Sequence, residues 1–145
     1  MKIAVGSDHA GYRLKEALKE PLESRGHQII DYGTFSEESV DYPDIGFKVA
    51  RGVANGQYER GILVCGSGQG MVMAANRVRG VRAALCFDPE AARMSRQHND
   101  ANLLVLSGWN VPPKEAVKIL DVWLTTEFEG GRHLRRIKKL DNLML

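Results

Sequence analysis

Short apolar segments alternate along the chain with longer stretches in which apolar residues recur at helical spacing. The strand-like segments cover residues 3–7, 28–32, 61–65, 81–86 and 102–106. The helix-like stretches cover 11–25, 41–56, 68–76, the segment from 88 to about 99, a segment opening at 112–113, and 131–145. Segment 61–65 is apolar throughout, which predicts a strand in the centre of a parallel sheet. The pattern as a whole predicts five consecutive strand–helix units.

Individual residues mark several helix ends. Asp88 followed by Pro89 is typical of a helix N-terminus, with Asp as the cap and Pro in the first helical position. Gly26 is expected to end the first helix, and Pro21 to kink or shorten it. Five such units predict a Rossmann-like three-layer α/β/α sandwich with a five-stranded parallel sheet, formed by a single domain of residues 1–145.

Composition narrows the class of protein. The 145 residues carry a formal net charge of +2, with 43% hydrophobic and 26% charged residues. This balance is that of a globular domain and excludes a disordered chain. It gives no overall attraction to nucleic acid or to an anionic membrane. We expect a cytoplasmic protein, because no apolar run is long enough to span a membrane and there is no room for a signal peptide.

Cysteine and histidine are sparse. Two cysteines, Cys65 and Cys86, stand 21 residues apart without a CxxC pair, so a disulfide framework is not expected. The four histidines show no ligand spacing, so no metal site and no cofactor are expected. His27 and His133 have no sequence context that suggests chemistry.

The segment 65–70, Cys-Gly-Ser-Gly-Gln-Gly, joins a strand to a helix at the edge of the sheet where ligands bind. Its glycines let backbone N–H groups approach a phosphate or a developing oxyanion. A tight turn that needs glycine for geometry alone is an equally good interpretation. Cys65 favours function, because a helix N-terminus is expected to lower its pKa and make it a nucleophile or a general base. A buried, inert thiol is the alternative for Cys65 and the preferred reading of Cys86.

Three other features admit both a functional and a structural reading. Asp8 and His9 follow the first strand, where they can bind a sugar or an anion, or Asp8 can cap the next helix. His98 can move protons or favour a helix C-terminus. Four basic residues share one face of the last helix and fit a phosphate clamp, a nucleic-acid patch or a solvated face: Arg132, Arg135, Arg136 and Lys139.

Taken together, the motifs resemble the family of type B ribose-5-phosphate isomerases and galactose-6-phosphate isomerase subunits, over nearly the whole chain. The matching segments are Gly6-Ser-Asp-His-Ala-Gly11, Asp41-Tyr-Pro43, Cys65-Gly-Ser-Gly-Gln-Gly70, Ala75-Asn-Arg77, Ser95-Arg-Gln-His-Asn99 and Gly130-Gly-Arg-His133. The resemblance implies metal-free aldose–ketose isomerisation of ribose 5-phosphate through an enediol. It also implies a homodimer or a dimer of dimers, with active sites between subunits and the C-terminal helix packed on the partner.

The resemblance also implies roles for individual residues. Cys65 would be the general base, Ser67 would place its hydroxyl near the reacting oxygens, and the amides of the loop, with Gly66, Gly68 and Gly70, would hold the enediolate. The remaining roles would be ring opening by His98 with Asp8 and Tyr42, binding of sugar hydroxyls by Asn99, and binding of phosphate by His9, Arg132 and Arg136.

The chain departs from the family at Trp109, where an arginine commonly helps to hold the phosphate. Trp109 has no charge but can stack on a sugar. This substitution keeps two alternatives open: an isomerase of another sugar or sugar phosphate, such as allose or galactose 6-phosphate, a tetrose phosphate or a free sugar, and a non-catalytic sugar-phosphate binding protein. A nucleic-acid binder is not expected, because no aromatic residues interleave the basic face.

Overall fold

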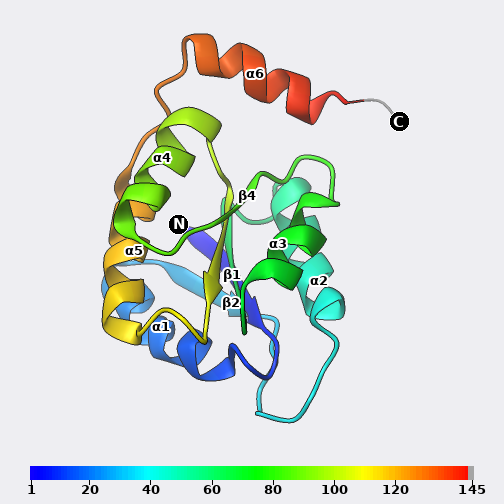
Figure 1. Ribbon diagram of the computed structural model, residues 1–145, viewed down its shortest axis with the longest axis vertical. Helices are drawn as coiled ribbons and strands as arrows, with labels where there is room; N and C mark the ends of the chain where they lie inside the picture. Colours follow the sequence, from blue (N-terminus) through cyan, green and yellow to red (C-terminus); the bar gives the residue numbers. More distant parts are fainter. Residues whose placement is uncertain (144–145) are drawn as a thin grey trace.

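The computed structural model describes residues 1–143, which form a parallel sheet covered by helices on both faces (Figure 1). The strands are β1 (Lys2–Ser7), β2 (Gln28–Asp31), β3 (Arg60–Cys65), β4 (Ala83–Leu85) and β5 (Leu103–Ser107). The helices are α1 (Tyr12–Ser24), α2 (Tyr42–Ala54), α3 (Gln69–Asn76), α4 (Pro89–Asn99), α5 (Pro113–Thr125) and α6 (Arg132–Asp141). The predicted three-layer α/β/α fold is therefore confirmed.

The strands lie in the order β2-β1-β3-β5-β4, and all neighbouring pairs are parallel. The apolar strand β3 occupies the centre, as predicted. The chain turns to one side of β1 to form β2 and to the other side to form β3, so the order reverses between β1 and β3. In open α/β sheets the crevice at such a point, beyond the carboxyl ends of the strands, is where ligands bind. In this chain those ends carry Ser7 and Cys65.

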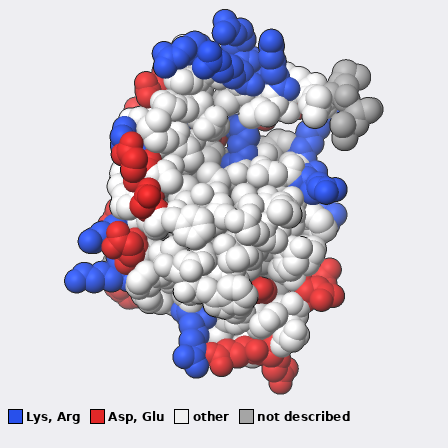
Figure 2. Space-filling view, in the orientation of Figure 1, with Lys and Arg blue, Asp and Glu red and all other residues white. Residues whose placement is uncertain are grey.

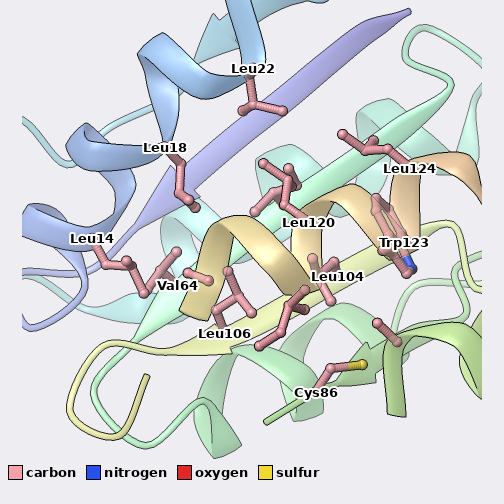
Figure 3. Close-up of a cluster of buried hydrophobic side chains, with 14 of the residues drawn as sticks. Leu14, Leu18, Leu22, Val64, Cys86, Leu104, Leu106, Leu120, Trp123 and Leu124 are labelled. Carbon is pink, nitrogen blue, oxygen red and sulfur yellow. The ribbon is translucent and has the colours of Figure 1, made fainter. Parts of the chain in front are cut away.

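Alternate residues of the central strands enter two separate cores, one on each face of the sheet. On the first face α1 and α5 pack against Val64, Leu104 and Leu106 (Figure 3). On the second face α2 and α3 cover Leu63, Val105 and the side chain of Cys65. Because both faces are covered, the strands are apolar in nearly every position, and the functional residues are confined to the strand ends and the loops.

Most element boundaries lie within two residues of the predicted ones, and the larger differences concern Pro21, β4 and the last helix. Helix α1 continues through Pro21 to Ser24, because a proline so close to the end removes only one helical hydrogen bond. Strand β4 is shorter than predicted, since it lies at the sheet edge and the N–H of Val81 is bonded within the preceding turn. The last helix ends at Asp141, and the part of its prediction that falls on 144–145 lies outside the described residues. None of the helices within 1–143 is long and apolar enough to cross a membrane.

Helix α6 packs mainly against α4 rather than against a face of the sheet. It lies across the end of the molecule near α4, away from the carboxyl ends of the strands (Figure 1). Only His133 and Ile137 of this helix are buried. The basic side chains of α6 gather on its outer side, and the molecule is hollowed between α6 and the sheet (Figure 2). This hollow is a cavity of about 770 Å³ whose lining includes Arg82, Asn99 and Leu140.

Candidate active site

The glycine loop connects the end of β3 to the start of α3 and carries Cys65 as its first residue. Gly68 caps α3 in a left-handed conformation with φ of +84°, which any other residue would adopt only under strain. A methyl group at Gly68 would also lie 2.4 Å from Leu85. Glycine is therefore required at this position for geometry, so the structural reading of the loop is correct for Gly68. The functional reading depends on the residues that surround the loop.

The connection that follows β5 is bonded to the glycine loop. The Ser107 hydroxyl donates to the carbonyl of Gly66 over 2.7 Å, and the N–H of Gly108 donates to the carbonyl of Cys65 over 2.8 Å. The N–H of Trp109 donates to the Gly66 carbonyl over 3.0 Å. These bonds hold the backbone around Cys65 in one conformation, as a site that binds a transition state requires.

Two aromatic side chains flank the loop. A methyl group at Gly66 would lie 2.5 Å from the Trp109 indole, and one at Gly70 would lie 2.6 Å from the Tyr42 ring. Gly66 and Gly70 therefore permit the close approach of the two rings. Trp109 is 73% exposed and Tyr42 is 38% exposed, so both offer a ring face to a ligand on the loop. Tyr42, Trp109 and the glycine loop therefore lie together in the structure.

The Cys65 thiol is buried, with only 4% of the residue exposed. Burial raises the pKa of Cys65, and the nearby Asp8 carboxylate raises it further. The backbone N–H groups of Met71, Gly68 and Gly70 act in the opposite direction but do not outweigh burial. The expectation that the helix N-terminus would lower the pKa of this thiol is therefore wrong for the isolated chain. Cys86 is the buried, inert thiol predicted, since burial raises its pKa to about 11.

Asp8 and His9 lie beside the Cys65 loop, at the end of β1. The N–H of Asp8 donates to the carbonyl of Val64, and an Asp8 carboxylate oxygen accepts from the N–H of Gly11 over 2.9 Å. Asp8 is thus both a buried turn residue and a neighbour of the thiol. The His9 Nδ1 atom accepts from the N–H of Val40 over 3.2 Å, which leaves Nε2 for a ligand. Ser67, half-buried, accepts from the N–H of Gln69.

The other expected site residues lie at the opposite end of the sheet. His98 and Asn99 end α4, just before the start of β5, whereas Cys65 is aligned with Ser107 at the end of β5. At about 3.3 Å per residue, the five residues of β5 place these two ends roughly 13 Å apart or more. Arg132 and Arg136, on α6, lie at the His98 end. Each chain therefore carries two separate half-sites, one around Cys65 and the other around His98.

The second half-site contains two residues that the sequence did not single out for chemistry. His133 stacks on His98, with ring centroids 4.5 Å apart and an angle of 15° between the rings. Glu129 Oε1 lies 3.8 Å from His98 Nε2. The sequence suggested that the four histidines are dispersed, but two of them lie together in the structure. The one available signal was the segment Gly130-Gly-Arg-His133, because 35 residues separate His98 from His133 and no local spacing links them.

Comparison with known proteins identifies the family. Residues 3–140 match the family model described as Ribose/Galactose Isomerase. The chain is 45% identical over 139 residues to ribose-5-phosphate isomerase B of Escherichia coli, covering 96% of this chain and 93% of that protein.

Solved structures agree with this assignment. A ribose 5-phosphate isomerase of Thermotoga maritima superposes with a TM-score of 0.95 at 51% identity, covering 98% of each chain. The ribose-5-phosphate isomerase B of Mycoplasma genitalium, solved with bound ribulose-5-phosphate, superposes with a TM-score of 0.92 at 44% identity, covering 97% of this chain and 93% of that one. This chain therefore belongs to the Ribose/Galactose Isomerase family.

Proposed function

We propose that the chain is an aldose–ketose isomerase that interconverts ribose 5-phosphate and ribulose 5-phosphate. The observation that carries the proposal is the position of Cys65, on a glycine loop at the point where the strand order reverses. Asp8, Tyr42 and Trp109 surround the same loop. Family membership supports the reaction type, and the Mycoplasma genitalium relative with bound ribulose-5-phosphate supports the substrate class.

In the proposed reaction Cys65 removes the proton on C2 of the open-chain aldose in its thiolate form, which the raised pKa makes a minor fraction at pH 7 in the free chain. The electron pair of that C–H bond forms the C1–C2 double bond, and the carbonyl electrons move to O1, which gives an enediolate. The thiol then returns the proton to C1 while the O2 proton moves to O1, which yields the ketose. The loop N–H groups stabilise the developing negative charge, and the Ser67 hydroxyl stands near the same oxygens. These groups supply both the base and the charge stabilisation, so the step needs no metal ion.

Ring opening and phosphate binding need residues from the second half-site. We assign His98 to proton transfer during ring opening, with Asn99 holding sugar hydroxyls. A five-carbon sugar phosphate is too short to contact both ends of one chain. A homodimer would bring the two half-sites together, because the partner subunit's His98 can face the Cys65 loop. Two equivalent sites then form. The exposed Leu134 and Leu140 of α6, and Leu143 just after it, support this arrangement, since they offer an apolar surface to a partner.

The phosphate would then be held from both subunits. His9 lies on the Cys65 side, and the partner subunit's Arg132 and Arg136 approach from α6. Arginine suits this role because its guanidinium binds phosphate oxygens in pairs. Both arginines are exposed in the isolated chain and free to take part in such a contact.

A second candidate substrate follows from Trp109. The indole lies against the glycine loop, where an arginine commonly stands in the family. An uncharged ring favours stacking on a sugar face over binding of a phosphate. Under this alternative the same proton transfer acts on another aldose, including an unphosphorylated one.

The test is turnover of ribose 5-phosphate by the purified chain in the presence of EDTA, with ribose and allose as parallel substrates. The proposal expects fast formation of ribulose 5-phosphate and no conversion of the free sugars. Turnover of a free sugar only would favour the second candidate. Binding of sugar phosphates without turnover of any of them would overturn the assignment as an enzyme.

A further inference from the structure

Three side chains that bind metals in other proteins converge where α4 ends and α6 begins. One donor atom each from His98, Glu129 and His133 lies within 4.8 Å of the other two. A tetrahedral ion needs its donors about 3.3 Å apart, given metal–ligand distances near 2.0–2.1 Å. The Glu129 side chain is 51% exposed, so it can rotate the short distance required.

The buried member of the cluster lacks a partner. His133 is 7% exposed, and its Nε2 atom makes no hydrogen bond within the described part of the chain. A buried polar atom without a hydrogen-bond partner is unfavourable, so such atoms usually have a partner or a ligand. Stacking on His98 covers the faces of the ring but does not satisfy the ring nitrogen. The unpartnered nitrogen is an observation independent of the cluster's composition, and it points to a missing ligand.

The backbone holds the three residues in place. The N–H of Glu129 donates to the carbonyl of Gln97 over 3.1 Å, and the Arg96 guanidinium donates to the carbonyl of Thr126 over 3.1 Å. The loop before α6 is therefore attached to the last turns of α4. Gly130 and Gly131 have positive φ of 69° and 58°, which turns the chain so that His133 faces His98. The backbone therefore brings the three side chains together before any ion binds. The stacked rings of His98 and His133 lie at only 15° to each other, so the partly exposed His98 ring must turn about its side-chain bonds before both nitrogens point at one ion.

We propose that His98, Glu129 and His133 form an inhibitory site for a divalent transition-metal ion of the zinc type. Two imidazoles and one carboxylate, with a fourth position left open, are a set that zinc favours. Magnesium and calcium prefer oxygen ligands and are not expected to bind. The arginines nearby repel cations, so the ion must be held by strong coordinate bonds to nitrogen.

The surroundings also keep His133 in the form that binds metal. Burial lowers the pKa of His133, and the positive charges of Arg132 and Arg136 and the His98 ring lower it further, against the opposing effect of Glu129. The imidazole is therefore neutral at pH 7, and its lone pair is available.

A metal ion bound at this site would prevent His98 from acting in catalysis. A ring nitrogen bound to a metal ion cannot transfer a proton to or from the sugar. Zinc should therefore inhibit turnover, and EDTA should restore it. This consequence rests on the proposed function, whereas metal binding itself does not.

The experiment uses the untagged, full-length chain, stripped with EDTA and dialysed. Zn²⁺ is titrated against a coloured chelator, and Co²⁺ is titrated in parallel for the visible absorption of a tetrahedral site. The expected result is one ion per chain. His133→Gln and Glu129→Gln should each weaken binding about 10-fold or more, because even the loss of a residue that only orients a ligand costs 10–100-fold.

The matched control is His27→Gln. His27 lies outside the cluster, with its Nδ1 atom 3.0 Å from the N-terminal amino group, and this variant should bind zinc as the wild type does. Equal zinc affinity in the wild type, His133→Gln and Glu129→Gln would overturn the site, as would the absence of stoichiometric binding in the wild type. If His133→Gln does not fold because residue 133 is buried, the Glu129→Gln variant still tests the site.

Turnover provides the second measurement. Wild type and His27→Gln should lose activity with added zinc and regain it with EDTA, while Glu129→Gln should need about 10-fold more zinc. Normal zinc binding without inhibition would overturn the inhibitory role. If the chain turns over no sugar at all, the proposed function fails, but the titration still decides the metal site.

Discussion

Trp109 lies directly against Gly66 on the loop that carries Cys65. Its N–H donates to the Gly66 carbonyl over 3.0 Å, and its indole occupies the space that a side chain at residue 66 would need. Trp109 is therefore part of the candidate site, with its outer face open to a ligand. Its side chain is placed to influence which sugar binds.

We expect Trp109→Arg to lower the KM for ribose 5-phosphate about 10-fold and to leave kcat within a few-fold of the wild type. A guanidinium at this position adds a charged hydrogen bond to the phosphate, worth about 1.5–3 kcal/mol. Trp109→Ala serves as the control and should raise KM, because it removes the stacking face without adding a charge. Steady-state kinetics with both variants give the answer. A higher KM in Trp109→Arg would mean that the phosphate does not lie near residue 109.

The separation of Cys65 from His98 predicts complementation between subunits. Cys65→Ala and His98→Asn should each be nearly inactive, but a mixture of the two, dissociated and reassembled, should recover activity. In a hybrid dimer one site carries both substitutions and the other carries neither, so a random mixture should show about a quarter of wild-type activity. Size-exclusion chromatography confirms that dimers have re-formed. Re-formed dimers without any activity would show that each site lies within a single chain.

The pKa of Cys65 predicts slow, pH-dependent alkylation. Burial raises this pKa, so the thiol is neutral at pH 7 and the thiolate fraction grows about tenfold for each unit that the pH rises toward the pKa. Modification by iodoacetamide, followed by mass spectrometry of the peptide, should accelerate continuously from pH 7 to pH 9. Cys86, whose pKa is raised to about 11, should react more slowly at every pH. A rate for Cys65 that is constant from pH 6 to pH 8 would instead indicate a lowered pKa.

A buried ion pair near the site predicts a stability effect. The Lys15 ammonium, with only 1% of the side chain exposed, lies 2.7 Å from an Asp31 carboxylate oxygen, and Lys19 contacts the same oxygen. Burial alone would raise the pKa of Asp31, but the hydrogen bonds from Lys15 and Lys19 outweigh it and hold this pKa below its ordinary value. Asp31→Asn should lower the free energy of unfolding by about 1.5–3 kcal/mol, because the buried Lys15 ammonium loses its shorter charged hydrogen bond and keeps only Glu16, 3.1 Å away, as an ionic partner.

The sign of the pH dependence follows from the lowered pKa. The stabilisation from Asp31 is fully present above the ordinary carboxyl pKa of about 4 and is lost as the pH falls through the lower, folded-state value. Urea unfolding at pH 7 and pH 3 should therefore show a smaller difference between wild type and Asp31→Asn at the lower pH. A difference that is unchanged or larger at pH 3 would contradict the ion-pair account.

Local patterns in the sequence were sufficient to predict the alternation of strands and helices and the loop from Cys65 to Gly70. Parallel strands bring their carboxyl ends to one edge, so the grouping of Asp8, Cys65 and Trp109 also followed from the order of the elements. Spacing along the chain could not predict the stacking of His98 on His133, because it depends on where a separate helix, α6, is attached to α4.

Properties that depend on the burial of a side chain also could not be predicted from the sequence pattern. The raised pKa of Cys65 results from burial of the thiol under α2 and α3, which outweighs the helix N-terminus. Lys15 occupies an ordinary position in the helical pattern of residues 11–25, and only its approach to Asp31 on the neighbouring strand makes it a buried charge.

The most direct measurement is kcat for ribose 5-phosphate in Cys65→Ala compared with Cys86→Ala, with circular dichroism to show that both variants are folded. The account predicts that Cys65→Ala loses a factor of about 10²–10⁴ or more, as expected for loss of a general base, while Cys86→Ala stays close to wild type. A kcat in folded Cys65→Ala that equals the wild-type value would contradict the central claim that Cys65 moves the proton.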